Sequence, residues 1–210
     1  MSAKRDRDRL VQELIEVGRD ASRRGLVLAS AGNLSARVAD DRFVVSASGA
    51  WFDRLTPDDF VELGPDDLET GAAVNGVTPS SEWKLHHRAY RARPDVECVL
   101  HLHPRTAIVL ASLGREIRRL TLDHAYYLGS IGVTPFFHNG TDELADTAAE
   151  QLRHHDCVVM RHHGCSVVAG TVEMAYRRAL NLEDAAQATA LALQLGDTGT
   201  VFPDDGARHA

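Results

Sequence analysis

The sequence has few cysteines and no long apolar run. Cys98, Cys157 and Cys165 are odd in number and form no CxxC pair, so the sequence predicts neither a disulfide framework nor a thiolate zinc site. We expect all three to be reduced residues of the core. No stretch approaches the roughly 20 apolar residues that span a bilayer, and the charged start MSAKRDRDRL lacks the apolar segment of a signal peptide. These absences predict a cytoplasmic protein without a membrane partner.

The sequence also lacks an excess of basic residues. It has 23 lysines and arginines against 30 acidic residues, a formal net charge of -7 at pH 7. A nucleic-acid surface needs clustered basic side chains for its phosphate contacts, so we expect no nucleic-acid partner and favour a small molecule. With 210 residues, of which 44% are hydrophobic, the chain can form one domain with a substantial core. We therefore expect a single domain over residues 1–210, with a mobile tail at about 197–210.

The apolar pattern predicts helices and strands that alternate along the chain. Leu10, Leu14 and Val17 follow a helical spacing, which predicts an amphipathic helix over residues 5–24. Later helices are expected over residues 81–93, 104–114, 142–155 and 171–195. Strands are expected over residues 26–38, 42–49 and 96–103, and a pair of strands around a glycine turn over residues 157–170. Residues 121–137 have an irregular pattern with β character. Several connections are too short for a crossover between parallel strands, so we predict a three-layer α/β fold, a mainly antiparallel sheet with helices on both faces.

Histidine is abundant, with 11 residues, and two of them form the motif HLHP at the end of a predicted strand. Side chains alternate along a strand, so Val99, His101 and His103 share one face. The two imidazoles, roughly 7 Å apart at their Cα atoms, can reach one ion, or they are polar groups on a solvated face. A zinc-type site takes three nitrogen or oxygen ligands, and the cluster RHHG at 161–164 offers the third.

Three further segments suit a bound anion. The helix predicted to begin near Ser81, in PSSEW, offers N–H groups and hydroxyls to a phosphate, with Glu82 in its first turn. The same pattern also describes an ordinary serine N-cap. The loops SAGNLS at 30–35 and SASG at 46–49 can bring backbone N–H groups close to a ligand, or are simply turns. Together, a metal, a carboxylate and a phosphate pocket indicate an enzyme that removes a proton beside a carbonyl held on a Lewis acid.

The segments GNLS, SASG, PSSEW, HLHP and RHHG, in this order and at this spacing, resemble the class II aldolase/adducin family, most closely its aldolases for L-fuculose 1-phosphate. The likeness extends to about Leu195. It implies that His101, His103 and His163 hold the metal, Zn²⁺ or alternatively Mn²⁺ or another divalent ion. It also implies that Glu82 is the catalytic acid/base and a metal ligand in the resting enzyme. The residues implied to bind the substrate phosphate are Gly32, Asn33, Ser48, Gly49, Ser80 and Ser81.

The resemblance implies a class II aldehyde-lyase of carbohydrate metabolism. Such an enzyme reversibly cleaves a ketose 1-phosphate, of the L-fuculose or 5-deoxypentulose type, into dihydroxyacetone phosphate and an aldehyde through a metal-bound enediolate. The family also contains methylthioribulose-1-phosphate dehydratases and sugar-acid phosphate decarboxylases, which are our alternatives. Pentulose-phosphate 4-epimerases typically carry aspartate at the position of Glu82. An adducin-type binding module has no need for three histidines together with this glutamate.

One departure from the family pattern concerns the aldehyde side of the reaction. In the fuculose-phosphate enzymes a tyrosine that follows a histidine donates a proton to the aldehyde oxygen, whereas here Ala125 follows His124. Tyr126 or Tyr127 is the candidate substitute, although in a β-region backbone Tyr126 would point away from the side of residue 125. Family members are commonly homotetramers with the active site at subunit boundaries, so a neighbouring chain could supply the missing group. We interpret His86, beside His87, as part of an ordinary helical pair.

Overall fold

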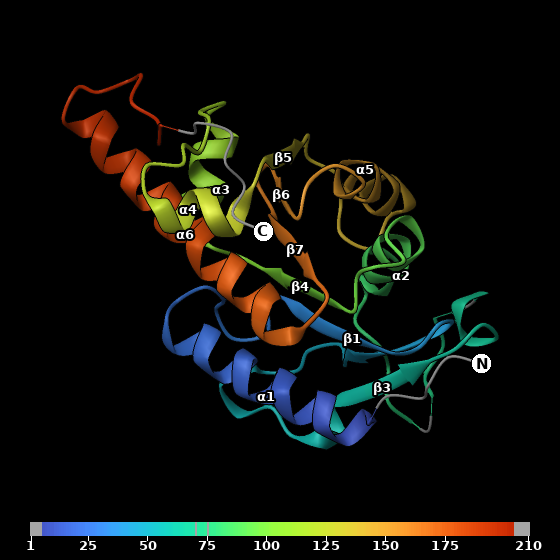
Figure 1. Ribbon diagram of the computed structural model, residues 1–210. Coiled ribbons are helices and arrows are strands. Elements are labelled where there is room, and N and C mark those ends of the chain that lie inside the picture. Colours follow the sequence, from blue (N-terminus) through green and yellow to red (C-terminus); the bar gives the residue numbers. More distant parts are fainter. Residues whose placement is uncertain (1–5, 70, 75, 204–210) are drawn as a thin grey trace.

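The described residues form a mixed sheet of seven strands that helices cover on both faces (Figure 1). The computed structural model describes residues 6–69, 71–74 and 76–203. The strand order is β3-β2-β1-β4-β7-β6-β5. The strands are β1 (Asn33–Ala39), β2 (Arg42–Ser46), β3 (Phe60–Leu63), β4 (Cys98–Leu102), β5 (Ile131–Thr134), β6 (Cys157–Met160) and β7 (Gly164–Ala169). The helices are α1 (Arg7–Arg23), α2 (Trp83–Ala92), α3 (Arg105–Ser112), α4 (Leu122–Leu128), α5 (Asp142–Leu152) and α6 (Val172–Gln194), with short 3-10 turns η1 (Phe52–Arg54), η2 (Pro57–Asp59) and η3 (Asp67–Glu69).

The helices divide into two layers around the sheet (Figure 1). α1, α3, α4 and α6 contribute to the larger core, and α2 and α5 pack on the other face. Cys98, Leu100 and Leu102 of β4 enter the larger core, whereas Val99 enters the core under α2. This alternation confirms the predicted faces of the strand and places His101 on the α2 side. The three cysteines are free and buried, as expected.

The predicted sheet is confirmed, with one parallel pair. Among the described strands, β5 and β6 run parallel, and the other five pairings are antiparallel. α5 connects β5 to β6, which is the long crossover that a parallel pair requires. The sheet is therefore mixed, and the parallel edge strand leads into a loop that reaches the functional site described below.

The prediction of irregular β character over residues 121–137 is partly wrong. Its first half is the helix α4, and only Ile131–Thr134 is a strand. Thr121 caps the helix, since its side chain accepts the N–H of His124, and His124 and Leu128 are buried. The aromatic residues in α4 favour strands when taken alone, which explains the misleading pattern. Because the backbone is helical, the strand argument about Tyr126 no longer applies, and this side chain is 63% exposed.

α2 begins at Trp83 and not near Ser81, where the sequence predicts its start. Ser80 organises the turn, because its hydroxyl accepts the N–H of Glu82 and its carbonyl accepts the N–H of Trp83. Glu82 therefore occupies the N-cap position, and its side chain makes no capping hydrogen bond. The carboxylate is left available for other partners.

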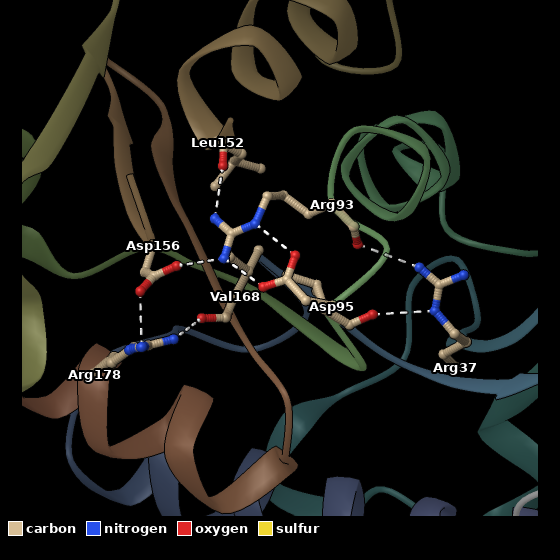
Figure 2. A network of polar contacts seen from close by, with 8 residues as sticks. Arg37, Arg93, Asp95, Leu152, Asp156, Val168 and Arg178 are labelled. Carbon is tan, nitrogen blue, oxygen red and sulfur yellow. Dashed lines mark hydrogen bonds and ion pairs between the residues drawn. The ribbon is translucent and has the colours of Figure 1, made fainter. Parts of the chain in front are cut away.

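A network of charged side chains holds together the end of the sheet at which β4 and β6 begin (Figure 2). Arg93, just after α2, pairs with Asp95 at 2.7 Å and with Asp156 at 3.1 Å. Asp156 also pairs at 2.7 Å with Arg178 of α6, and this guanidinium donates to the carbonyl of Val168. The network joins the two helical layers at the end of β4 opposite His101.

Within the described ranges, no helix combines the length and the apolar character needed to cross a membrane. After α6, the chain returns to Arg118, whose guanidinium donates to the carbonyls of Asp197 and Thr200. Residues 204–210 lie outside the described residues, so the expected mobility of this tail stays a prediction.

Candidate active site

Three histidines meet where β4 ends. His101 lies within β4, His103 follows it, and His163 lies in the turn between β6 and β7. Because β7 pairs with both β4 and β6, this turn lies beside the end of β4. The three ligand nitrogens lie within 4.8 Å of one another, and His101 Nε2 is 3.0 Å from His103 Nε2. The predicted histidine triad is therefore brought together in space.

Gly164 is what allows the imidazoles to approach one another. A Cβ atom at this position would lie 2.7 Å from His103 Cδ2, 2.7 Å from the carbonyl of Leu102 and 2.9 Å from His101 Cε1. Cβ contacts of this length are forbidden by steric repulsion, so any side chain here would displace the histidine rings or the strand. Steric crowding therefore explains why the last position of the RHHG motif is glycine.

Glu82 completes the cluster from the opposite side. Its Oε2 atom is 3.3 Å from His101 Nε2, and its Oε1 atom is 3.1 Å from His163 Nε2. The residue is only 6% exposed, yet Oε1 has no hydrogen-bond partner among the described residues. A buried carboxylate oxygen without a hydrogen bond, facing imidazole nitrogens, is the arrangement expected of ligands around a cation.

The protonation states of these groups also fit a cation. Burial lowers the pKa of His101 to about 4 and that of His103 to about 3, so both are neutral at pH 7. Burial would raise the pKa of Glu82, but His101, His163 and the amide of Asn33 outweigh it and hold this pKa below its ordinary value. Neutral imidazoles and an ionised carboxylate are the forms that coordinate metals. These residues could hold a divalent ion, and the donor set does not choose between zinc and manganese.

A cavity of about 340 Å³ opens beside this cluster. Its wall includes Glu82, His103 and His163, whereas His101 is fully buried behind it. The residues expected to bind phosphate also line the cavity: Gly32, Asn33, Ser48, Gly49, Ser80 and Ser81. The sequence places these segments far apart, and the structure brings every one of them to the same cavity.

Sheet pairing explains this convergence. Asn33 pairs with His101 across β1 and β4, so the loop before β1 lies next to the histidines. Ala47 forms a bridge with Pro79, which sets the SASG loop beside the PSSEW turn. Gly32 has a φ of +154°, and a Cβ atom there would lie 2.8 Å from the carbonyl of His101. The close approach of this loop to β4 therefore requires glycine.

Sequence reasoning missed one wall of the cavity. Phe136, Phe137, His138 and Asn139, in the loop after β5, all face it, as does His162. The loop is placed by tertiary packing at Gly140, which has a φ of +75° and where a Cβ atom would lie 2.9 Å from the carbonyl of Ser81. No sequence motif marks these residues, since two aromatic residues in a row also suit a buried strand.

The segment that contains Tyr126 and Tyr127 does not line this cavity. Ala125, Tyr126 and Tyr127 line a separate cavity beside α6. His124 is fully buried, and its Nε2 atom lies 2.7 Å from Asp184 Oδ2. Neither Tyr126 nor Tyr127 therefore stands beside the histidine cluster of its own chain.

Known proteins resemble this chain in sequence and in fold. Residues 12–190 match the family model described as Class II Aldolase and Adducin N-terminal domain. A 5-methylthioribulose-1-phosphate/5-deoxyribulose-1-phosphate aldolase of Rhodospirillum rubrum is 31% identical over 196 residues, 93% of this chain and 86% of that protein. A methylthioribulose-1-phosphate dehydratase of Gluconacetobacter diazotrophicus is 34% identical over 186 residues, 82% of this chain and 88% of that protein. The crystal structure of L-fuculose-1-phosphate aldolase from Thermus thermophilus superimposes with a TM-score of 0.80 and 30% identity, covering 93% of this chain and 100% of that chain. The chain belongs to the class II aldolase/adducin family.

Proposed function

We propose that this protein is a metal-dependent aldolase that reversibly cleaves a ketose 1-phosphate into dihydroxyacetone phosphate and an aldehyde. One observation carries the proposal: the carboxylate of Glu82 lies within 3.3 Å of two histidine nitrogens at the wall of a cavity lined by serine and glycine. A proton-transfer group, cation ligands and anion-binding groups are the parts that this reaction needs.

His101, His103 and His163 would hold the metal, with Glu82 as a further ligand in the resting enzyme. A bound divalent cation supplies a Lewis acid that polarises the substrate carbonyl and neutralises charge on the oxygens beside it. We propose zinc, with manganese or another divalent ion as the alternative, because imidazole and carboxylate ligands suit both.

The serine and glycine side of the cavity would bind the substrate phosphate. Ser48 and Ser81 are exposed and can turn their hydroxyls toward an anion. Ser80 Oγ accepts the N–H of Glu82, so its own hydroxyl proton can donate to a phosphate oxygen. Asn33 has a second amide hydrogen beyond the one that it donates to Glu82. The proposed phosphate ligands are Gly32, Asn33, Ser48, Gly49, Ser80 and Ser81.

Glu82 would move the proton at C3. In the cleavage direction the C4 hydroxyl loses its proton, the C3–C4 bond breaks, and the electron pair of that bond passes to the dihydroxyacetone phosphate half. Glu82, which would be protonated when the substrate is bound, then gives its proton to C3 and is left ionised, while the proton of the C4 hydroxyl passes to the group described below. In the synthetic direction the ionised Glu82 removes the same proton. Its 6% exposure keeps bulk water away from the carboxylate during this transfer.

The group that takes the proton from the C4 hydroxyl would come from a neighbouring chain. The position of Tyr126 and Tyr127, which line a different cavity of their own chain, supports this proposal. We therefore propose a homotetramer with the active site at a subunit boundary. The cytoplasmic location and the single-domain organisation over residues 1–210 stay predictions.

Methylthioribulose-1-phosphate dehydration is the second candidate. The relative that carries this activity in its name is 34% identical, and Ala125 removes the tyrosine expected of a fuculose-phosphate aldolase. A dehydratase would use the same cation ligands with a different general acid. Sugar-acid phosphate decarboxylation, 4-epimerisation and an adducin-type binding role have no comparable observation in their favour.

The test is cleavage of a panel of ketose 1-phosphates by metal-loaded protein. The panel contains L-fuculose, L-rhamnulose and 5-deoxyribulose 1-phosphates, with release of dihydroxyacetone phosphate as the readout, and methylthioribulose 1-phosphate scored also for loss of water. We expect release that needs both the metal and Glu82, so that Glu82→Gln abolishes it while His87→Gln, outside the cavity, does not. Water loss without release of dihydroxyacetone phosphate would favour the dehydratase.

A further inference from the structure

A line of buried hydrogen bonds runs behind Glu82 into the space between β1 and α2. Asn33 Nδ2 donates to Glu82 Oε2 at 2.9 Å, and the other end of this amide, Oδ1, bonds to His86 Nε2. His86 Nδ1 lies 2.6 Å from Ser35 Oγ, which in turn lies 2.7 Å from the hydroxyl of Tyr90. All five side chains belong to residues that are at most 6% exposed.

The direction of every bond in this line follows from the carboxylate. An ionised Glu82 can only accept, so the Asn33 amide presents its NH₂ group to Glu82 and its oxygen to His86. His86 must then carry its proton on Nε2, which leaves the lone pair of Nδ1 to accept the Ser35 hydroxyl. Ser35 Oγ accepts in turn from Tyr90. Each group donates toward Glu82, and this order requires a neutral His86.

The surroundings of His86 keep it neutral. It is fully buried, and this burial lowers the pKa of His86 to about 3. Burial also raises the pKa of Tyr90 well above its ordinary value, so the phenol keeps the proton that it donates. His86 is absent from the residues that line the cavity, and Asn33 connects it to Glu82 through hydrogen bonds.

The spacing of residues along α2 and along β1 places these five side chains next to one another. Glu82, His86 and Tyr90 are four residues apart, so they lie on one face at and after the start of α2. Asn33 and Ser35 are two residues apart on β1 and therefore share the face of the strand that meets this helix. The interpretation of His86 as an ordinary helical residue is wrong for this reason.

We propose that His86, supported by Ser35 and Tyr90, is a positioning residue that fixes the Asn33 amide so that its NH₂ group orients the Glu82 carboxylate. An apolar side chain of similar size could fill the same space. It would leave the buried oxygen of Asn33 without a donor, so the amide would lose one of the two hydrogen bonds that fix its orientation beside the carboxylate. The catalytic consequence rests on the proposed function, because Glu82 is the proton-transfer group there.

Three variants test the catalytic consequence. His86→Leu removes both hydrogen bonds, whereas the amide nitrogen of His86→Gln can replace Nε2 as the donor to Asn33. His87→Leu is the matched control, since His87 is the neighbouring half-buried histidine and contacts Arg88 instead of this line of hydrogen bonds. We expect kcat to fall about 10- to 100-fold in His86→Leu, as for other groups that orient a metal ligand. We expect His86→Gln to stay within about threefold of the unmodified protein.

The tautomer of His86 can be measured whether or not the protein has catalytic activity. Nitrogen NMR of histidine-labelled protein, with the His86 signal assigned by its loss in His86→Gln, should show the proton on Nε2 and none on Nδ1 at pH 7. A proton on Nδ1 would overturn the proposal, and so would equal kcat values for two folded proteins, His86→Leu and His86→Gln. If the unmodified protein cleaves no ketose 1-phosphate, the proposed function fails, but the tautomer still decides whether the line of hydrogen bonds has this direction.

Discussion

Glu82 Oε1 lies 3.1 Å from His163 Nε2, and this buried oxygen has no hydrogen-bond partner among the described residues. Glu82 stands at the start of α2 and His163 in the turn between β6 and β7, so the contact closes the site across the end of the sheet. A shared cation would give this carboxylate oxygen and the lone pair of the imidazole nitrogen a common partner, whereas the two lone pairs alone repel each other.

Metal binding should therefore stabilise the fold. A ligand at about 1,000 times its Kd adds about 4 kcal/mol to the free energy of unfolding, so zinc should raise the Tm of chelator-treated protein by several degrees. His163→Ala should lose most of this increase, whereas His154→Ala, which removes an exposed imidazole on the surface, should keep it. Thermal unfolding with and without zinc measures both. An equal increase in the two variants would exclude the histidine cluster as the binding site.

Gly164→Ala should weaken the metal site without replacing any of the residues proposed as ligands. The added Cβ atom would lie 2.7 Å from His103 Cδ2, so the imidazole must shift away from its present position. Groups that orient metal ligands typically affect metal affinity about 10- to 100-fold, and we expect a loss of this size in competition with a coloured chelator. Gly199→Ala is the control, because a Cβ atom there meets no atom within 4 Å. Unchanged affinity in Gly164→Ala would show that the ring has room to move.

The metal-free protein should lose stability as the pH falls below about 6.5. The pKa of His86 is lowered to about 3 by burial, below the value of about 6.5 for an exposed histidine. Between these values the unfolded chain binds a proton at this residue and the folded chain does not, so the free energy of unfolding decreases with falling pH.

His86→Gln isolates this contribution. It removes one titrating group, so the pH slope of the free energy of unfolding between pH 6 and pH 4 should decrease by about 1.4 kcal/mol per pH unit. Urea unfolding of the metal-free proteins over this range measures the slope. Parallel curves for the variant and the unmodified protein would mean that His86 is protonated in the folded state as readily as in the unfolded one.

Asp156 should matter for stability but not for catalysis. It accepts one hydrogen bond from Arg93 and forms an ion pair of 2.7 Å with Arg178 (Figure 2). Asp156→Asn leaves two guanidinium groups around a neutral amide, which should cost about 2 kcal/mol, as for other lost bonds to charged groups.

Glu150→Gln is the matched control for Asp156→Asn. Its carboxylate pairs with Arg153 on the surface, where such pairs contribute at most about 1 kcal/mol. Chemical unfolding compares the two variants, and kcat should be unchanged in both because the network lies at the far end of β4. A fall in kcat for Asp156→Asn alone, at a temperature where the protein is folded, would contradict this separation.

Much of the site could be predicted from the sequence because its residues belong to regular elements. The period of two along β4 places His101 and His103 on one face, and a glycine after His163 indicates a tight turn. Such local rules do not depend on the rest of the fold, and the mainly antiparallel sheet followed from them as well.

The parts that sequence reasoning missed depend on contacts between distant segments. The loop that contains Phe136 and Asn139 reaches the cavity only because β5 pairs with β6 and Gly140 packs against the PSSEW turn. His86 resembles any helical histidine until β1 is known to face α2. α4 was missed because its N-cap, Thr121, is followed by residues that also suit a strand.

Glu82 should transfer a proton at C3 of dihydroxyacetone phosphate with the help of a metal held by His101, His103 and His163. Proton NMR of dihydroxyacetone phosphate in D₂O, without any aldehyde, tests this step alone. Metal-loaded protein should replace one C3 hydrogen by deuterium, and both Glu82→Gln and removal of the metal should abolish the exchange. Absence of exchange by metal-loaded protein, or equal exchange by Glu82→Gln, would contradict the account.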